Sequence, residues 1–246
     1  MAGLTLFHAS DLHFGAEDRA ALDWFMAAVH REKPAAVVCT GDLTMHGTAR
    51  QFALAQAWLE QLPVPVSLEP GNHDVPYYHL MWRRMTRPWH HYRALEAAIE
   101  APLELAGAAV IPLLTVAPAQ WRLNWSKGRV ARGDLAKTLA GLAAHANLGL
   151  RLVAGHHPLV DADTASTGST RGGRAALAAL AAAGADAVLS GHVHDPFDLT
   201  LHAGGRPIRL IGAGTLSQRL RTTPPSYNRL DWSAETGLAV TVCRMA

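Results

Sequence analysis

The feature of the sequence that most restricts its fold is an alternation of short apolar runs with longer Ala- and Leu-rich stretches of helical character. Each apolar run ends in a cluster of Gly, Asp, Asn or His. This alternation is typical of α/β proteins. The predicted strands are Leu4–Ala9, Ala35–Thr40, Val64–Leu68, Val110–Thr115, Leu150–Ala154 and Ala187–Ser190, and the predicted helices are Asp18–Arg31, Thr48–Gln61, Gly133–Ala146 and Gly172–Ala183.

Two regions depart from this alternation. Near the end of the chain, Leu199–His202, Arg206–Ile211 and Leu238–Cys243 are separated by Gly and Pro turns, which indicates antiparallel strands and therefore a mixed sheet or a second sheet. Val75–Leu105 is rich in Trp, Tyr, His and Arg, and we expect it to be helical and partly exposed.

Composition limits the class of protein. A chain of 246 residues with 49% hydrophobic residues can bury a full core, and we expect a single domain over residues 1–246. A net charge of +2 is not the charge balance of a nucleic-acid coat or a membrane-surface protein. Since no spanning segment or signal peptide is evident, and the two cysteines suit a reducing compartment, we expect a cytoplasmic location.

Five short polar motifs stand at the carboxyl ends of the apolar runs. The loops that leave these ends of an α/β sheet converge on one crevice, so residues far apart in sequence meet there. Four of the motifs carry a glycine, which allows a sharp turn where strand gives way to loop. The motifs are Asp11-Leu12-His13, Gly41-Asp42, Gly71-Asn72-His73-Asp74, Gly155-His156-His157-Pro158 and Gly191-His192-Val193-His194.

The side chains of these motifs are ligands for transition metals. Imidazole together with carboxylate suits divalent zinc, manganese, iron or nickel, whereas an all-oxygen set would indicate magnesium or calcium. A carboxylate such as Asp42 can bridge two cations, and two ions about 3.5 to 4 Å apart can clamp the attacking and leaving oxygens of an in-line displacement. The motifs therefore predict hydrolysis of a phosphate ester.

The ordered set of motifs, from Ser10 to His194, resembles the calcineurin-like metallophosphoesterases, whose pattern is D-x-H, G-D, G-N-H-D or E, a later His and G-H-x-H. The insertion after the third motif and Gly214-Thr215-Leu216-Ser217 are most similar to the bacterial branch related to class III cyclic nucleotide phosphodiesterases. The resemblance implies an α/β fold, a four-layer α/β/β/α sandwich of two mixed sheets flanked by helices. A small helical cap is expected at about residues 75–105.

The resemblance also implies roles for individual residues. Two divalent or mixed-valence transition metal ions (manganese, iron or zinc) are expected, with a metal-bridging hydroxide as nucleophile. His73 would face the scissile phosphate as the catalytic residue, with Asp74 orienting it. The first ion would be held by Asp11, His13 and His194, the second by Asn72, His156 and His192, and Asp42 would bridge them.

Several neighbouring residues have alternative interpretations. His157 is either a substrate contact or a histidine that packs beside or supports the ligands, and His8 is expected to be a satisfied core residue or one that supports a ligand. Arg219 and Arg221 could neutralise phosphate charge, but surface exposure is the more common fate of such arginines. The aromatic residues of the insertion either stack on substrate or anchor the cap to the body.

The expected function is hydrolysis of a small phosphodiester such as a cyclic nucleotide. The alternatives are a nuclease, disfavoured by the charge, and a phosphomonoesterase, because the metal clamp serves both kinds of ester. A lipid-linked diphosphate hydrolase is a further alternative, disfavoured because this sequence has no clearly amphipathic basic helix. A non-catalytic scaffold is disfavoured because none of the expected ligands is missing. The expected partner is a small phosphoester rather than nucleic acid or a membrane, and a homodimer through the insertion is a further possibility.

Overall fold

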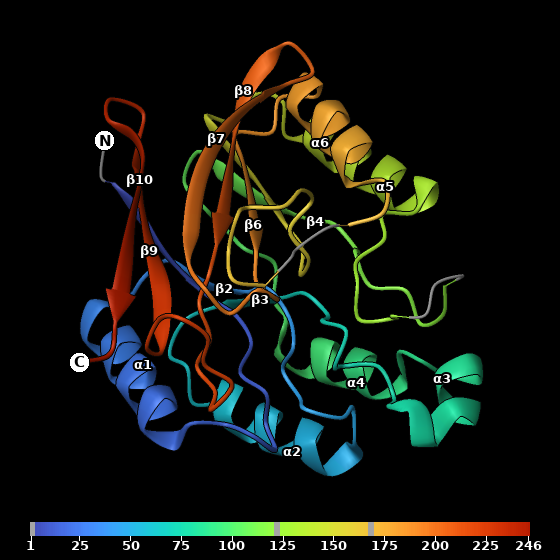
Figure 1. The fold of residues 1–246 in the computed structure, drawn as a ribbon. Helices are drawn as coiled ribbons and strands as arrows, with labels where there is room; N and C mark the ends of the chain where they lie inside the picture. The colour runs from blue at the N-terminus through green and yellow to red at the C-terminus, as the bar shows by residue number, and fades with distance from the viewer. Residues whose placement is uncertain (1–2, 121–123, 167–169) are drawn as a thin grey trace.

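The computed structural model describes residues 3–120, 124–166 and 170–246, which form two five-stranded sheets with helices on both outer surfaces (Figure 1). In the first sheet the strand order is β10-β9-β1-β2-β3, where β1, β2 and β3 are parallel and β9 and β10 are antiparallel additions. Its strands are β1 (Leu4–Ala9), β2 (Ala36–Cys39), β3 (Val66–Leu68), β9 (Ser226–Ser233) and β10 (Gly237–Arg244).

The second sheet has the order β4-β5-β6-β8-β7. Four of its strands are parallel, and β7 pairs antiparallel with β8 at the edge. Its strands are β4 (Ala108–Pro112), β5 (Leu150–Ala154), β6 (Ala187–Ser190), β7 (Phe197–Ala203) and β8 (Arg206–Gly212).

Three apolar clusters hold the layers together. One lies between the two sheets and includes Leu6 and Val38 from the first sheet and Leu152 and Leu189 from the second. The others lie under helices on the outer faces, which explains why β2 and β6 are buried along their whole length. The helices are α1 (Arg19–Glu32), α2 (Ala49–Leu59) and α4 (His90–Ile99) on the first sheet and α5 (Arg132–Ala144) and α6 (Gly173–Ala182) on the second.

These layers confirm the predicted four-layer α/β/β/α sandwich of two mixed sheets flanked by helices. One strand was not predicted: β9 lies between β1 and β10 although it contains polar residues such as Asn228 and Arg229. The predicted strand at 110–115 is β4, which begins at Ala108 and ends at Pro112.

The segment from 75 to 105 is helical, as predicted. It contains a short 3₁₀ turn at Tyr78–Leu80, α3 (Met81–Thr86) and α4. The buried Tyr92 of α4 donates a hydrogen bond to the Leu68 carbonyl over 2.8 Å, so this aromatic residue anchors the segment to the body. By contrast Trp82 is 80% exposed on α3, which lies at the edge of the molecule in Figure 1.

Within the described part of the chain, no helix has the length and apolar character needed to cross a membrane.

Candidate metal centre

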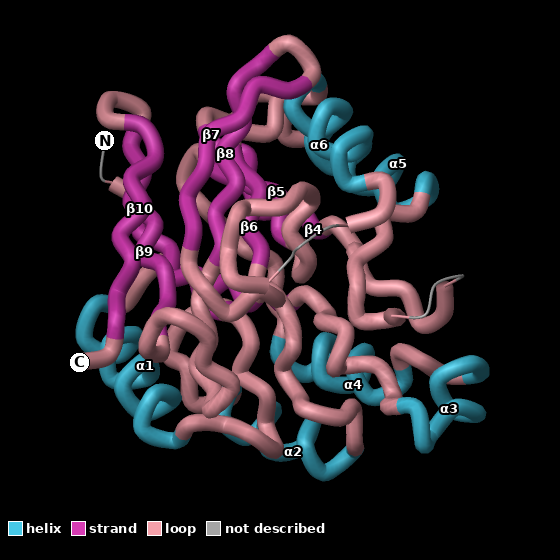
Figure 2. The backbone as a smooth tube through the Cα atoms, viewed as in Figure 1, coloured by secondary structure: helices cyan, strands magenta, loops and turns pink. Residues whose placement is uncertain are grey.

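The candidate site lies where the loops at the carboxyl ends of β1, β2, β3, β5 and β6 meet (Figure 2). All seven predicted ligands are on these loops. Three of the loops come from the first sheet and two from the second, so the site straddles the seam between the sheets.

The first half-site consists of Asp11, His13, Asp42 and His194. All four side chains are buried, and each offers a ligand atom within 4.8 Å of the others. The Asp11 Oδ1 atom lies 3.1 Å from His194 Nε2, and Asp42 Oδ2 lies 3.6 Å from His13 Nε2.

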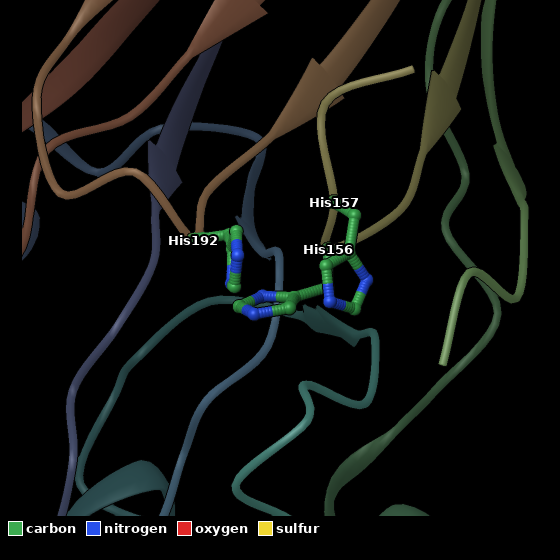
Figure 3. A group of neighbouring side chains, drawn as sticks. All are labelled: His156, His157 and His192. Carbon is green, nitrogen blue, oxygen red and sulfur yellow. The ribbon is translucent and has the colours of Figure 1, made fainter. Parts of the chain in front are cut away.

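The second half-site consists of Asn72, His156 and His192. His156 Nε2 lies 3.2 Å from Asn72 Oδ1 and 3.4 Å from Asp42 Oδ2. The rings of His156 and His192 have centroids 5.2 Å apart, and both stand on loops from the second sheet (Figure 3). Asp42 therefore lies between the two half-sites, in the place that a bridging carboxylate would need.

The backbone at the site is strained. Five predicted ligands adopt the left-handed conformation that non-glycine residues rarely occupy, and such residues concentrate at functional sites. Among the described residues only Lys33 and Asp163 share this property without being predicted ligands. The five are Asp11, His13, Asp42, His192 and His194, with φ between 47° and 70°.

Glycines allow the loops to approach closely. A Cβ atom on Gly71 would overlap the backbone and carboxylate of Asp42, and one on Gly191 would overlap Ser10 Oγ and Asp11 Oδ2. The motif glycines are thus required for contact between loops as well as for turning the chain.

Each carboxylate has one oxygen fixed and one directed at the site. Asp11 Oδ2 accepts from the His192 N–H over 2.9 Å, and Asp42 Oδ1 accepts from the His73 N–H over 2.8 Å. The other oxygen, Asp11 Oδ1, is buried without a hydrogen-bond partner. Fixing one oxygen orients the second toward the imidazoles.

The imidazoles are oriented in the same way. His156 Nδ1 lies 2.7 Å from the Thr40 carbonyl oxygen and His194 Nδ1 lies 2.6 Å from that of Arg219. A carbonyl requires a donor, so Nδ1 carries a proton in each ring, and the neutral form of the ring directs its Nε2 lone pair into the site. This is the arrangement of metal-ligating histidines.

These lone pairs face other acceptors. His13 Nε2 and His194 Nε2 are 3.3 Å apart, and His156 Nε2 faces oxygens of Asp42 and Asn72. Converging lone pairs, together with the unpartnered Asp11 Oδ1, require protons or cations to offset their repulsion. Residues of this imidazole, carboxylate and amide set fit first-row transition metals.

The ionisation of the site reflects the same convergence. Burial alone would raise the pKa of Asp42, but His156 holds it well below its usual range. Burial opposes protonation of His156, yet the Asp42 carboxylate raises its pKa to about 9. Burial lowers the pKa of His192 to about 3, so this ring stays neutral. Without metal, a proton on His156 thus balances part of the charge that cations would otherwise balance.

His73 faces the first half-site, but Asp74 does not orient it, and that prediction was wrong. His73 Nδ1 lies 2.7 Å from the Met45 carbonyl oxygen, which fixes the ring with Nε2 toward the site. The carboxylate of Asp74 instead accepts hydrogen bonds from Leu43, Thr44 and Gly71. Asp74 holds together the turns that carry Asp42 and Asn72.

His157 lies beside His156 and His192, and the three rings have ligand atoms within 4.8 Å of one another (Figure 3). Both of its nitrogens are already engaged: Nδ1 lies 3.0 Å from Thr115 Oγ1 and Nε2 lies 2.8 Å from the Ser126 carbonyl oxygen. We therefore assign His157 a packing role. His8 is the satisfied core histidine that was predicted, bonded to Thr40 and Asn228.

The segment after β8 contributes more to the site than the sequence indicated. Thr215 Oγ1 donates to the Asp11 carbonyl over 2.7 Å, and Arg219 Nη1 lies 3.0 Å from His73 Nε2. The Gly-Thr-Leu-Ser sequence that precedes Arg219 was the available signal. Arg221, two residues later, is exposed as expected for a surface arginine.

The model of the calcineurin-like phosphoesterase family matches residues 4–196. Because this match covers most of the sequence and includes every motif, the chain belongs to that family of metallophosphoesterases. No curated protein matches the chain in sequence.

Solved structures share the fold over the whole chain. A dimetal phosphatase from Danio rerio is similar with a TM-score of 0.66 and 14% identity, covering 99% of both chains. The purple acid phosphatase PPD1 from yellow lupin has a TM-score of 0.70 and 12% identity, covering 99% of this chain and 52% of its own. GAP50 of Plasmodium has a TM-score of 0.63 and 13% identity, covering 99% and 85%. At these identities the similarity establishes the fold.

Proposed function

We propose that this protein is a dinuclear metal-dependent phosphodiesterase that hydrolyses a small phosphodiester, with a cyclic nucleotide as the first substrate to test. The observation that carries the proposal is the position of Asp42. Its Oδ2 atom lies 3.6 Å from His13 Nε2 and 3.4 Å from His156 Nε2, so one carboxylate oxygen serves both half-sites.

The residues present fit two cations. Asp11, His13 and His194 would hold one ion, Asn72, His156 and His192 the other, and Asp42 both. When bound, such a pair of ions offsets the charge of the phosphoester and lowers the pKa of coordinated water toward about 7. The hydrogen bonds to the Thr40 and Arg219 carbonyls orient the histidines before any ion arrives.

His73 is the residue that would act on the leaving group. Its ring is fixed through Nδ1 by the Met45 carbonyl, and its Nε2 atom faces the first half-site. The ring centroids of His73 and His13 are 4.9 Å apart. Because Nδ1 keeps its own proton on the Met45 carbonyl, the ring can donate a proton from Nε2 to the leaving oxygen only in its imidazolium form. Alkoxide leaving groups, as in a nucleotide diester, have the greatest need of such a proton.

The size of the substrate is inferred from charge and from resemblance. A net charge of +2 is small for a protein that binds a nucleic-acid duplex through its phosphates. The insertion at 75–105 and Gly214-Thr215-Leu216-Ser217 resemble the bacterial branch related to class III cyclic nucleotide phosphodiesterases. Both points favour a small diester.

The proposal can be tested with metal-stripped protein refilled with manganese, zinc or iron. We expect bis(p-nitrophenyl) phosphate to be cleaved faster than p-nitrophenyl phosphate, and only with metal. Asp42→Ala should lose about a thousandfold or more of the rate because both ions lose a ligand. His73→Ala should lose about 100- to 10,000-fold while retaining metal, as expected for loss of a proton donor.

His202→Ala serves as the control, because His202 is an exposed residue of β7 and should leave the rate unchanged. Faster cleavage of the monoester would replace the diesterase proposal with a phosphatase. Absence of hydrolysis with every metal, although two ions bind, would reject the enzyme and favour a scaffold.

A further inference from the structure

Arg219 places a guanidinium group at the candidate metal centre. Its Nη1 atom lies 3.0 Å from His73 Nε2 and 3.3 Å from His13 Nε2, and the side chain is partly buried.

The loop that carries Arg219 is tied to the first half-site on one side. Thr215 Oγ1 donates to the Asp11 carbonyl, and it also lies 2.7 Å from Ser217 Oγ. Ser217 Oγ in turn accepts from the Arg219 N–H over 3.3 Å, while the Arg219 carbonyl accepts from His194. The backbone of Arg219 is thus connected to two predicted ligands.

The far end of the same loop is tied to the residue after His194. Asp195 Oδ1 accepts from the Thr222 N–H over 3.0 Å, from Thr222 Oγ1 over 2.8 Å and from Thr223 Oγ1 over 3.1 Å. A further backbone hydrogen bond runs from Gln218 to Ala16. The position of Arg219 is therefore set before a substrate binds, which lowers the entropic cost of using it.

Among the described residues the guanidinium of Arg219 has no acidic partner and belongs to no ion pair. Its side chain contacts two imidazoles and the Met45 sulfur. A guanidinium has five N–H donors, and a carboxylate or phosphate is the partner that fits its fork. An ion held by His13 would also use the Nε2 lone pair that Arg219 now faces.

We propose that Arg219 binds the phosphoryl group of the substrate and the phosphate of the product. This inference rests on the proposed hydrolysis of phosphoesters at the same site, and it adds a residue that lies outside the five motifs. Arg219 would donate to phosphoryl oxygens beside His73. Because its positive charge acts more strongly on a dianion than on a monoanion, Arg219 contributes more to binding of the monoester product than to binding of the diester substrate.

A structural role would have a different signature. If Arg219 only supported His73, its removal would reduce turnover but leave the affinity for free phosphate unchanged. Phosphate affinity therefore separates the two roles.

The test is titration calorimetry of inorganic phosphate into metal-loaded protein, for wild type, Arg219→Gln, Arg219→Lys and Arg221→Gln. Metal content and melting temperature are measured on the same samples. We expect Arg219→Gln to weaken phosphate binding by about 10- to 100-fold, the usual effect of a charged hydrogen bond, with both ions retained. Arg219→Lys should be intermediate, because it keeps the charge but not the fork.

Arg221→Gln is the matched control, since Arg221 is exposed in the same loop, and its phosphate affinity should equal that of wild type. Phosphate affinity of Arg219→Gln within about twofold of wild type, with both ions bound, would overturn the inference. If Arg219→Gln loses metal, Arg219→Lys decides the question: weaker phosphate binding with both ions bound supports the inference, and unchanged binding overturns it.

Calorimetry needs no turnover, so this inference and the proposed function fail separately. A wild-type protein that binds phosphate through Arg219 but cleaves no ester would reject the proposed function alone. A wild-type protein that cleaves diesters, with unchanged phosphate binding in Arg219→Gln, would reject the role of Arg219 alone.

Discussion

The two half-sites of the candidate metal centre are built differently. All four residues of the first half-site are buried, and all four adopt the left-handed backbone conformation. In the second half-site only His192 does so, and Asn72 and His192 are partly exposed. The first half-site also contains both carboxylates, whereas the second shares Asp42.

This difference indicates unequal affinity. Left-handed backbone at a non-glycine residue costs on the order of 1 kcal/mol, which the surrounding structure must offset. Because the surrounding structure must hold these strained residues in place, we expect the first half-site to be rigid before metal binds. Its two anionic ligands also strengthen its attraction for a cation. We therefore expect the first half-site to hold its ion more tightly and the second to exchange its ion more readily.

The largest expected effect comes from removing one histidine from either half-site. His156→Ala should retain one ion through dialysis against a weak chelator, and His13→Ala should lose the tightly held ion. Each should reduce hydrolysis by about a thousandfold, because charge stabilisation by one ion amounts to several kcal/mol. Elemental analysis and rates measured on the same samples test this. Equal metal loss in the two variants would contradict the proposed asymmetry.

A smaller effect is expected from filling the space at Gly191, beside Asp11. Gly191→Ala would overlap Ser10 Oγ and Asp11 Oδ2, and we expect a loss of about 1–3 kcal/mol in the free energy of unfolding. Gly133→Ala is the control, since a Cβ there meets nothing within 4 Å and alanine favours helix α5. Denaturant unfolding measures both. A Gly191→Ala protein as stable as wild type would show that the first half-site is less rigid than we infer.

The smallest expected effect is a pH-dependent change in stability, and it concerns the strands that precede the two half-sites. His8 precedes Asp11 by three residues and is bonded to Thr40 and Asn228. Glu69 precedes Asn72 by three residues and is 4% exposed, and its carboxyl group has no hydrogen bond to any of the described residues. Burial, followed by the Glu100 and Glu96 carboxyls, raises the pKa of Glu69 well above its usual range. The second half-site thus follows a strand with an uncompensated buried acid.

A raised pKa in the folded state means that the native protein binds more protons than the unfolded chain. The stability contributed by Glu69 is therefore complete below the unfolded pKa, about 4.3, and is lost as pH rises through the folded pKa. We expect Glu69→Gln to exceed wild type in stability at pH 8 and to lose this advantage toward pH 5. Each unit of pKa elevation corresponds to about 1.4 kcal/mol. Thermal unfolding at several pH values measures the difference.

Glu235→Gln, on the exposed turn between β9 and β10, should show no such dependence. Parallel pH profiles for wild type and Glu69→Gln would contradict the prediction.

The sequence predicted most of the fold because its central strands are buried on both faces and therefore appear as continuous apolar runs. β9 was missed for the opposite reason. Its Asn228 is polar but can be buried because it bonds to His8 of β1 and to the Gly212 carbonyl. No local sequence pattern predicts such distant partners. Pairing of β9 with β1 depends on residues more than two hundred positions apart.

Some features of the site could likewise be predicted from the sequence, and others could not. The seven predicted ligands meet because motif spacing reflects strand ends, which converge by topology. The partner of His73 was not predictable, since the choice between Asp74 and the Met45 carbonyl depends on how the Asp42 turn packs. Arg219 was undervalued because nothing local distinguishes it from the exposed Arg221; only the anchoring of its loop to Asp11 and His194 does so.

The position of the site across the seam between the sheets has a mechanical consequence. The carboxylates and Asn72 belong to loops of the first sheet, and His156, His192 and His194 to loops of the second. Ions bound between them would act as cross-links at one end of the sandwich, so part of their binding free energy would become resistance of the two sheets to separation. Loss of the ions would then weaken the packing of the two sheets against each other as well as abolish the chemistry of the site.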